Sequence, residues 1–161
     1  MNSLLAMTAL LFKLPPGLLI GLCAVESSLD PKAINWTDGG SASYGLCQIK
    51  EATAKGEGFE GDTVLLLNPL INAFHSASYL SRQLTRYGGD YCSAIAAYNA
   101  GTRRFNKRGL FINEAYVKKV LIGWKRYEKA NAYLPRLKGD TTRSALATFD
   151  LRCQKLYNGA I

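Results

Sequence analysis

The chain has 161 residues, of which 48% are hydrophobic and 20% charged, and its formal net charge is +8. This length and composition suit a single globular domain over residues 1–161 with one sizeable core. The positive charge favours anionic partners, but the scattered basic residues and the absence of a recognised binding motif argue against nucleic acid. The densest basic cluster is interpreted as a solvated face: Arg103, Arg104, Lys107 and Arg108.

The first twelve residues, MNSLLAMTALLF, form an apolar run that resembles the core of a signal peptide. No basic residue precedes the run, and no small-x-small site separates it from Lys13, which argues against cleavage there. The run is too short to span a bilayer, so no membrane span is predicted. We expect a first amphipathic or buried helix, in a chain with no obvious export signal of its own.

Helical signals dominate the rest of the chain. Pro16 suits the first turn of a helix over residues 16–28, which ends before Pro31. Residues 35–46, NWTDGGSASYGL, are rich in Gly, Ser, Asp and Asn, and they predict a loop with at most a short β-hairpin. A short helix is expected to follow over residues 50–55.

The strongest helical periodicity covers residues 68–87. Its apolar side chains trace one face: Leu70, Ala73, Phe74, Ala77, Leu80, Leu84 and Tyr87. His75 points away from that face and is expected at the surface. A Gly-Gly pair ends this helix, and Asp90 is expected to cap the next, over residues 91–100.

Two more helices are predicted. One covers about residues 113–130, with aromatic and apolar residues near one stripe, and the chain then breaks at Pro135. A last, basic helix is expected over residues 141–157, within a C-terminal helical extension of about 131–161. No convincing strand and no internal repeat is visible. The prediction is therefore an all-α fold.

Four cysteines are present: Cys23, Cys47, Cys92 and Cys153. None forms a CxxC pair and their spacing is irregular, so zinc is not expected, and no other metal or cofactor is predicted. Two disulfides are arithmetically allowed. Because Cys23 and Cys92 lie in predicted helices among small apolar residues, reduced cysteines are favoured.

Glu26 stands on a predicted apolar helix face. Leu19, Leu22, Glu26 and Leu29 fall at i, i+3, i+7 and i+10, which lines one side of a helix. A carboxyl in such a place loses hydration, its pKa rises, and it can act as a general acid near neutral pH. The alternative is a glutamate at the rim that faces solvent or meets a lysine.

Four short sequence blocks occur in a particular order. They are AVESSLDPKAIN (24–35), SYGLCQIKEATA (43–54), AIAAYNAG (94–101) and EAYVKKV (114–120). Together they resemble the lytic transglycosylase domain of glycoside hydrolase family 23, which has the goose-type lysozyme-like fold. The resemblance covers about residues 10–125.

The resemblance implies roles for individual residues. Glu26 matches the catalytic glutamate, the general acid and base of the family. The residues implied to bind the sugar are Ser27, Ser43, Tyr44, Gly45, Gln48, Tyr98, Asn99 and Tyr116. Asn35 stands where the family often has a serine, so Ser41 or Ser43 is expected to replace that contact. Cys47 replaces the usual methionine, which is a mild change of one soft side chain for another.

Some of these residues have structural alternatives. Gln48 could cap a helix, Asn99 could form a helix end, and Tyr98 and Tyr116 could be ordinary core residues. A buried tyrosine hydroxyl still needs a partner, and the resemblance implies that Glu26 is the partner of Tyr98.

The sequence offers one well-placed carboxylate, whereas glycoside hydrolysis normally uses two. Asp38 lies in the loop, Asp30 lies in a turn, and Lys50 stands where goose-type lysozymes have an aspartate. A single acid favours a peptidoglycan lytic transglycosylase that cleaves the β-1,4 bond between N-acetylmuramic acid and N-acetylglucosamine and leaves 1,6-anhydro ends. The alternatives are a goose-type hydrolase that uses Asp38 or bound water, and an inactive wall-binding module.

The expected partner is therefore the peptidoglycan glycan strand, bound by a monomer. The protein is expected to act in the periplasm or cell wall. Since no export signal is apparent, a phage enzyme released through a holin, a virion component, or a piece of a longer exported protein would each account for delivery.

Overall fold

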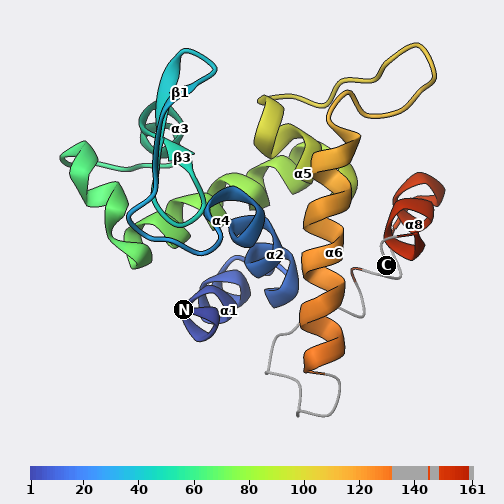
Figure 1. Cartoon of the computed structure of the whole chain (residues 1–161), viewed down its shortest axis with the longest axis horizontal. Helices are drawn as coiled ribbons and strands as arrows, with labels where there is room; N and C mark the ends of the chain where they lie inside the picture. Colours follow the sequence, from blue (N-terminus) through green and yellow to red (C-terminus); the bar gives the residue numbers. More distant parts are fainter. Residues whose placement is uncertain (132–144, 146–148, 160–161) are drawn as a thin grey trace.

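The computed structural model describes residues 1–131, 145 and 149–159 (Figure 1). Its helices are α1 (Asn2–Leu11), α2 (Pro16–Ser27), α3 (Glu51–Gly56), α4 (Pro69–Arg86), α5 (Tyr91–Ala100), α6 (Glu114–Ala130) and α8 (Leu151–Asn158), with the 3-10 helix η1 (Thr63–Leu67). The strands are β1 (Ile34–Asp38), β2 (Ser41–Tyr44) and β3 (Ile49–Lys50). The predicted predominantly helical fold is confirmed.

Helix ends follow the residues that favour them. Asp90 accepts a hydrogen bond from the Cys92 amide at 3.1 Å and so caps α5, as predicted. Gly101 ends α5 in the left-handed region with a φ of 72°. The Asn68 side chain caps α4 by accepting hydrogen bonds from the amides of Leu70 and Ile71.

The strands form one antiparallel sheet in the order β1-β2-β3. Ile34 pairs with Tyr44 and Asn35 with Ser43, so the hairpin expected within residues 35–46 is confirmed. The third strand, β3, was not predicted, because two residues are too few to show an alternating pattern. In Figure 1 the sheet and α3 lie on one side of the molecule, with α6 and α8 on the other.

The most extensive contact between two of the described helices joins α2 to α6. A Cβ added at Gly21 would lie 2.6 Å from the Trp124 amide nitrogen and 2.8 Å from the Val120 carbonyl oxygen. A Cβ added at Gly123 would lie 2.8 Å from the Gly21 Cα. Only glycine permits this backbone approach, which fixes how far α2 lies from α6.

Some predicted positions differ in the structure. Leu19 and Leu22 are fully buried on α2, but the helix ends at Ser27, and Leu29 follows it with a φ of 66°. Leu70 and Phe74 on α4 are 59% and 40% exposed, because this helix buries a face that includes polar residues such as Asn72. His75 is half-buried rather than at the surface, with its ring edge-on to Phe59 and Phe74.

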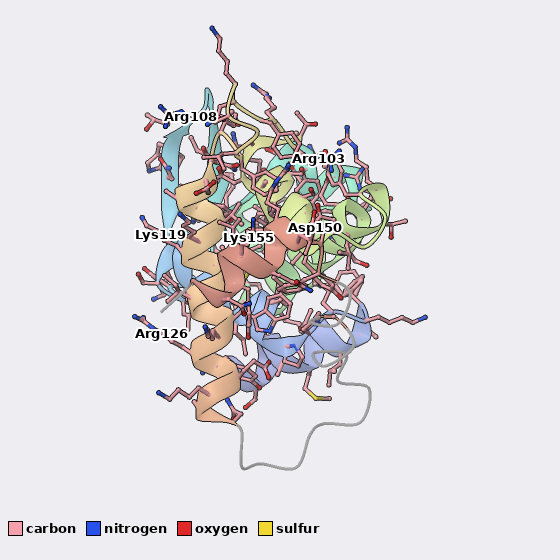
Figure 2. The ribbon with its side chains drawn as sticks, turned by 90° about the vertical axis from the view of Figure 1, so that its right-hand side faces the viewer. Arg103, Arg108, Lys119, Arg126, Asp150 and Lys155 are labelled. Carbon is pink, nitrogen blue, oxygen red and sulfur yellow. A yellow bond between two sulfur atoms is a disulfide. The ribbon has the colours of Figure 1, made fainter. Side chains whose placement is uncertain are left out.

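The end of the chain is described only in part. Residues 141–144 and 146–148 of the predicted last helix lie outside the described residues. Residues 149 and 150 are not helical, and α8 begins at Leu151, where the Asp150 side chain accepts a hydrogen bond from the Cys153 amide. One unbroken helix over residues 141–157 is therefore wrong. Figure 2 shows basic side chains on the face built by α6 and α8, among them Lys119, Arg126 and Lys155.

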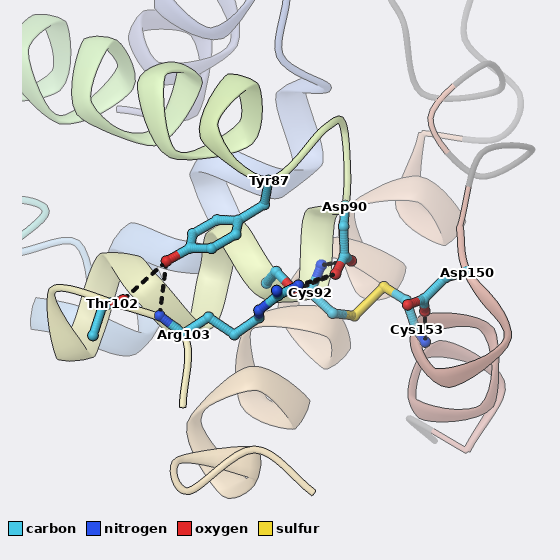
Figure 3. Close-up of polar contacts among 8 residues, drawn as sticks. Tyr87, Asp90, Cys92, Thr102, Arg103, Asp150 and Cys153 are labelled. Carbon is cyan, nitrogen blue, oxygen red and sulfur yellow. Dashed lines mark hydrogen bonds and ion pairs between the residues drawn. A yellow bond between two sulfur atoms is a disulfide. The ribbon is translucent and has the colours of Figure 1, made fainter. Parts of the chain in front are cut away.

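The cysteines are oxidised, so the expectation of reduced thiols is wrong. Disulfides join Cys23 to Cys47, with Cα atoms 4.2 Å apart, and Cys92 to Cys153, with Cα atoms 5.5 Å apart. Cys23 and Cys92 each face a partner that is distant in sequence, and the spacing of cysteines in the sequence does not give the distance between them in space. The Cys92–Cys153 bond holds α8 against α5 (Figure 3).

None of the described helices has both the length and the apolar character needed to cross a membrane. The described residues also contain no group of three or more His, Cys, Asp or Glu side chains arranged to hold a metal ion.

Replacing both Cys92 and Cys153 by alanine is expected to lower the free energy of unfolding by about 2–4 kcal/mol, because this bond closes a long loop in the unfolded chain. Urea unfolding under non-reducing conditions measures the change. An unchanged unfolding midpoint would show that the bond adds nothing to stability.

Candidate active site

A cleft of about 620 Å³ lies between the sheet and the C-terminal ends of α2 and α5. Five of the residues predicted from the sequence line it: Glu26, Ser43, Gln48, Tyr98 and Asn99. Its charged lining residues, among those the structure describes, are Glu26, Asp38, Lys50 and Arg104. The cleft thus gathers residues from α2, the sheet and α5, which are far apart in the sequence.

Glu26 lies in the last turn of α2 and is half-buried. Its Oε1 accepts a hydrogen bond of 2.5 Å from the Tyr116 hydroxyl of α6. The pKa of Glu26 is raised to about 7, chiefly by burial; the Tyr116 hydrogen bond lowers it in part, and the negative charge of Asp38 adds a smaller rise. The raised pKa predicted for Glu26 is therefore confirmed. Among the described ion pairs no lysine pairs with this carboxyl, so the lysine-paired alternative is wrong.

Asp38, the other carboxylate of the cleft, is paired. The Lys50 Nζ lies 3.5 Å from Asp38 Oδ2 and donates a hydrogen bond of 2.6 Å to the Asp38 carbonyl oxygen. Both side chains are about one-third exposed or more, so the pair adds little stability. Its effect is local, because it joins the end of β1 to β3 and gives Asp38 a cationic neighbour.

The backbone at Leu46 and Cys47 is held from three directions. The Ser27 hydroxyl donates to the Leu46 carbonyl oxygen at 2.6 Å, and the Tyr98 hydroxyl donates to the Cys47 carbonyl oxygen at 3.0 Å. The disulfide joins Cys47 to Cys23, one turn before Glu26 on α2. Tyr98 is a neighbour of Glu26, since burial and then the charge of Glu26 raise the pKa of its hydroxyl, but the expected hydrogen bond between them is not formed, and Tyr116 makes that bond instead.

Asn72 of α4 supports the same segment from below and is fully buried. Its Oδ1 accepts from the Cys47 amide at 2.9 Å, and its Nδ2 donates to the carbonyl oxygens of Tyr44 and Leu66, each at 2.7 Å. Gly45 passes between these groups with a φ of 69°, and a Cβ there would lie 2.5 Å from the Leu66 carbonyl oxygen. The glycine of this block is thus required by both conformation and space.

Gln48 is fixed by three hydrogen bonds. Its Nε2 donates to the carbonyl oxygens of Ala33 and Gly45 at 3.1 and 2.9 Å, and its Oε1 accepts from the Ser43 hydroxyl at 2.9 Å. The helix-cap alternative is wrong, because Lys50 occupies the N-cap position of α3. Gln48 therefore links Ala33, just before β1, to Ser43 of β2 and to Gly45, just after β2.

Asn99 is exposed at the end of α5, and its Oδ1 accepts a hydrogen bond of 3.0 Å from Asn113. Asn113 also donates to the Ala96 carbonyl oxygen at 2.9 Å, which links α5 to the start of α6. Ser27, Tyr44, Gly45 and Tyr116, the other predicted residues, are not among the lining residues and support the cleft from behind. Their contact with a sugar stays a prediction.

The sequence reading missed some residues of the site. Tyr79 and Arg104 line the cleft, and Asn72 holds its floor. Asn72 left a signal, since it shares one helical stripe with Ser76 and Gln83, at i, i+4 and i+11, and polar residues on one stripe of a long helix suggest buried hydrogen-bonding roles. Tyr79 gave no pattern that separates it from an ordinary helix residue. Arg104 belongs to the basic cluster interpreted above as a solvated face; its side chain is exposed, but it also lines the cleft.

Comparison with known proteins supports the resemblance. Residues 3–114 match the transglycosylase SLT domain. The chain belongs to this family. It is also 29% identical, over 99 residues, to protein IpgF of Shigella flexneri and to protein IpgF of Shigella sonnei. These stretches cover 60% of this chain and 64% of each IpgF chain, so the match spans slightly less than two thirds of these relatives.

Asn72→Ala is expected to cost about 2–4 kcal/mol of stability, because it leaves a buried amide and two buried carbonyl groups without partners. Urea unfolding measures the loss. Asn99→Ala, which removes an exposed amide, is the matched control and should change stability by less than about 1 kcal/mol. Equal effects of the two variants would contradict the supporting role of Asn72.

Tyr116→Phe is expected to raise the pKa of Glu26 further above about 7, because the hydroxyl that favours the carboxylate is lost while burial remains. Carbon-13 NMR titration of the glutamate carboxyl measures the shift. Tyr157→Phe, on α8, is the control and should leave this titration unchanged. A pKa of Glu26 that falls in Tyr116→Phe would contradict the assigned effect of the hydrogen bond.

Proposed function

We propose that this protein is a lytic transglycosylase that cleaves the bond between N-acetylmuramic acid and N-acetylglucosamine in peptidoglycan. Family membership indicates a transglycosylase that acts on peptidoglycan. The observation that carries the finer proposal is the state of Glu26. A carboxyl with a pKa of about 7 is present in both protonation states near neutral pH, so it can give up a proton and then take one back.

The proposed reaction uses this property twice. Glu26 donates its proton to the glycosidic oxygen, and the bond from that oxygen to C1 of the muramyl sugar breaks. The N-acetyl group of the same sugar stabilises the positive charge at C1. Glu26, now a carboxylate, takes the proton of the C6 hydroxyl while that oxygen bonds to C1. The 1,6-anhydro ring closes, Glu26 is protonated again, and no water is consumed.

The surrounding residues support this reaction because they hold the Glu26 carboxyl and the cleft floor in place. Tyr116 orients the carboxyl of Glu26 at 2.5 Å, and Gln48 is held rigidly at the cleft floor. The internal C6 hydroxyl competes well with water because it is held close to C1. In this proposal Ser43, Tyr98 and Asn99 contact the sugar from the lining of the cleft, while Ser27, Tyr44 and Gly45 set its shape.

One observation favours a second candidate, a goose-type hydrolase. Asp38 lines the same cleft, and its charge acts on Glu26, so it could position a water molecule. The ion pair with Lys50 favours the transglycosylase, because it engages Asp38 at the rim instead of leaving it free to act as a base. The two reactions leave different ends on the glycan: anhydro ends or reducing ends.

We further propose that the protein acts outside the cytoplasmic membrane. Its substrate lies there, and two disulfides suit an oxidising compartment. The phage routes and the longer exported precursor considered above would each deliver it to that place, and they stay predictions.

Glu26→Gln is expected to slow digestion of purified cell walls by about a hundred- to ten-thousand-fold, because the amide cannot donate the proton. Mass spectrometry of the fragments released by the unmodified protein should show 1,6-anhydro ends. Glu60→Gln, an exposed carboxylate outside the cleft lining, is the control and should digest walls normally.

Three results would overturn the proposal. Reducing ends would mean hydrolysis. Near-normal digestion by Glu26→Gln would mean that another group is the acid. Binding to walls without any fall in turbidity would mean an inactive wall-binding module.

A further inference from the structure

The cleft contains an arginine that the reaction above does not use. Arg104 lines it near the end of α5, and the side chain is exposed. Within the described residues its guanidinium has no ion pair, hydrogen bond or ring contact. The other cation of the lining, Lys50, is paired with Asp38. Arg104 is therefore the cation of the described lining that remains available to a ligand.

The preceding residue shows what a structural arginine in this loop looks like. The Arg103 guanidinium donates to the Ser93 hydroxyl at 3.1 Å, lies 4.0 Å from Asp90 Oδ2, and packs over the Tyr87 ring at 4.9 Å (Figure 3). Its backbone amide also donates to the Tyr87 hydroxyl at 2.9 Å. Arg103 is thus held in the fold and is not part of the cleft lining, whereas its neighbour lines the cleft with its guanidinium unengaged.

Arg104 also stands apart from the reacting carboxyl. The influences on the pKa of Glu26 are burial, Tyr116 and Asp38, and Arg104 is not among them. Its backbone is fixed, because its carbonyl oxygen accepts a hydrogen bond of 3.1 Å from the Ile112 amide across the 102–113 loop. The guanidinium thus offers a positive charge to a part of the ligand other than the bond being cut.

We infer that Arg104 binds a carboxylate carried by the substituent on C3 of a muramyl sugar, and so selects among peptidoglycan strands. This inference rests on the proposed function. A guanidinium presents parallel N–H donors that match the two oxygens of a carboxylate. The muramyl substituent supplies that group from one of two sources: a peptide-stem carboxylate, or the lactyl carboxylate where the stem has been removed. The glucosamine units carry no carboxylate, so the contact sets the register of the strand in the cleft.

The experiment measures binding of glycan strands to Arg104→Gln in a Glu26→Gln background, which separates recognition from turnover. Three strand preparations are compared: strands with peptide stems, the same strands with all stem carboxylates amidated, and strands freed of stems by an amidase. Arg104→Gln is expected to raise the Kd for a carboxylate-bearing strand about three- to tenfold at low salt, an effect of the size expected for an exposed ion pair. The Kd for fully amidated strands should not change.

The pattern identifies the source of the carboxylate. A loss confined to stem-bearing strands assigns it to the stem, and a loss on stem-free strands assigns it to the lactyl group. Lys107→Gln and Arg108→Gln, which remove the same charge from exposed positions of the same loop outside the cleft lining, are the controls and should bind normally. Arg104→Lys should keep part of the preference because it keeps the charge.

An equal loss on all three preparations, or equal losses in the control variants, would overturn the inference, because either would mean a general charge effect. Failure of the proposed function would look different. The unmodified protein would then release no anhydro ends, while the dependence of Kd on carboxylates and on Arg104 could still be measured.

Discussion

The site depends first on the close packing of α2 against α6. Gly21 and Gly123 bring the two backbones together, and a single added Cβ at either position would collide with main-chain atoms. This contact sets the register in which Glu26 at the end of α2 meets the Tyr116 hydroxyl near the start of α6. A buried carboxyl is costly unless a partner is available. The close packing at the two glycines therefore goes together with both effects on Glu26: burial, which raises its pKa, and the Tyr116 hydroxyl, which opposes that rise.

On the side of the cleft opposite Glu26, side chains hold the backbone in place through hydrogen bonds. Side chains from α2, α4 and α5 converge on the short segment that includes Leu46 and Cys47 and bind its carbonyl and amide groups; of these side chains, Tyr98 also lines the cleft. Some residues that carry the family resemblance therefore support the cleft without lining it. Ser27 and Gly45 are examples, since Ser27 donates to the Leu46 carbonyl oxygen and the Gly45 carbonyl oxygen accepts from the Gln48 side chain. Such supporting residues hold a site within the narrow geometry that catalysis needs.

Local signals in the sequence predicted most of the fold. Prolines and glycines mark helix ends through backbone conformation, which neighbouring residues decide, and the apolar run around Glu26 predicted its raised pKa. The predictions that were wrong concerned residues that are far apart in the sequence but close in the folded structure. The pairing of Cys92 with Cys153 spans 61 residues, and the choice of Tyr116 over Tyr98 as the partner of Glu26 rests on the rotation of two helices. Neither leaves a trace in periodicity.

The disulfide between Cys23 and Cys47, which are 24 positions apart in the sequence, closes a covalent ring in the chain. That ring contains Glu26, the β1–β2 hairpin and Asp38. The acid and the wall facing it are thus parts of one macrocycle, completed only when the two thiols are oxidised. A newly made chain in a reducing compartment has the same residues but lacks this closure. Completion of the cleft is consequently coupled to oxidation of these two thiols.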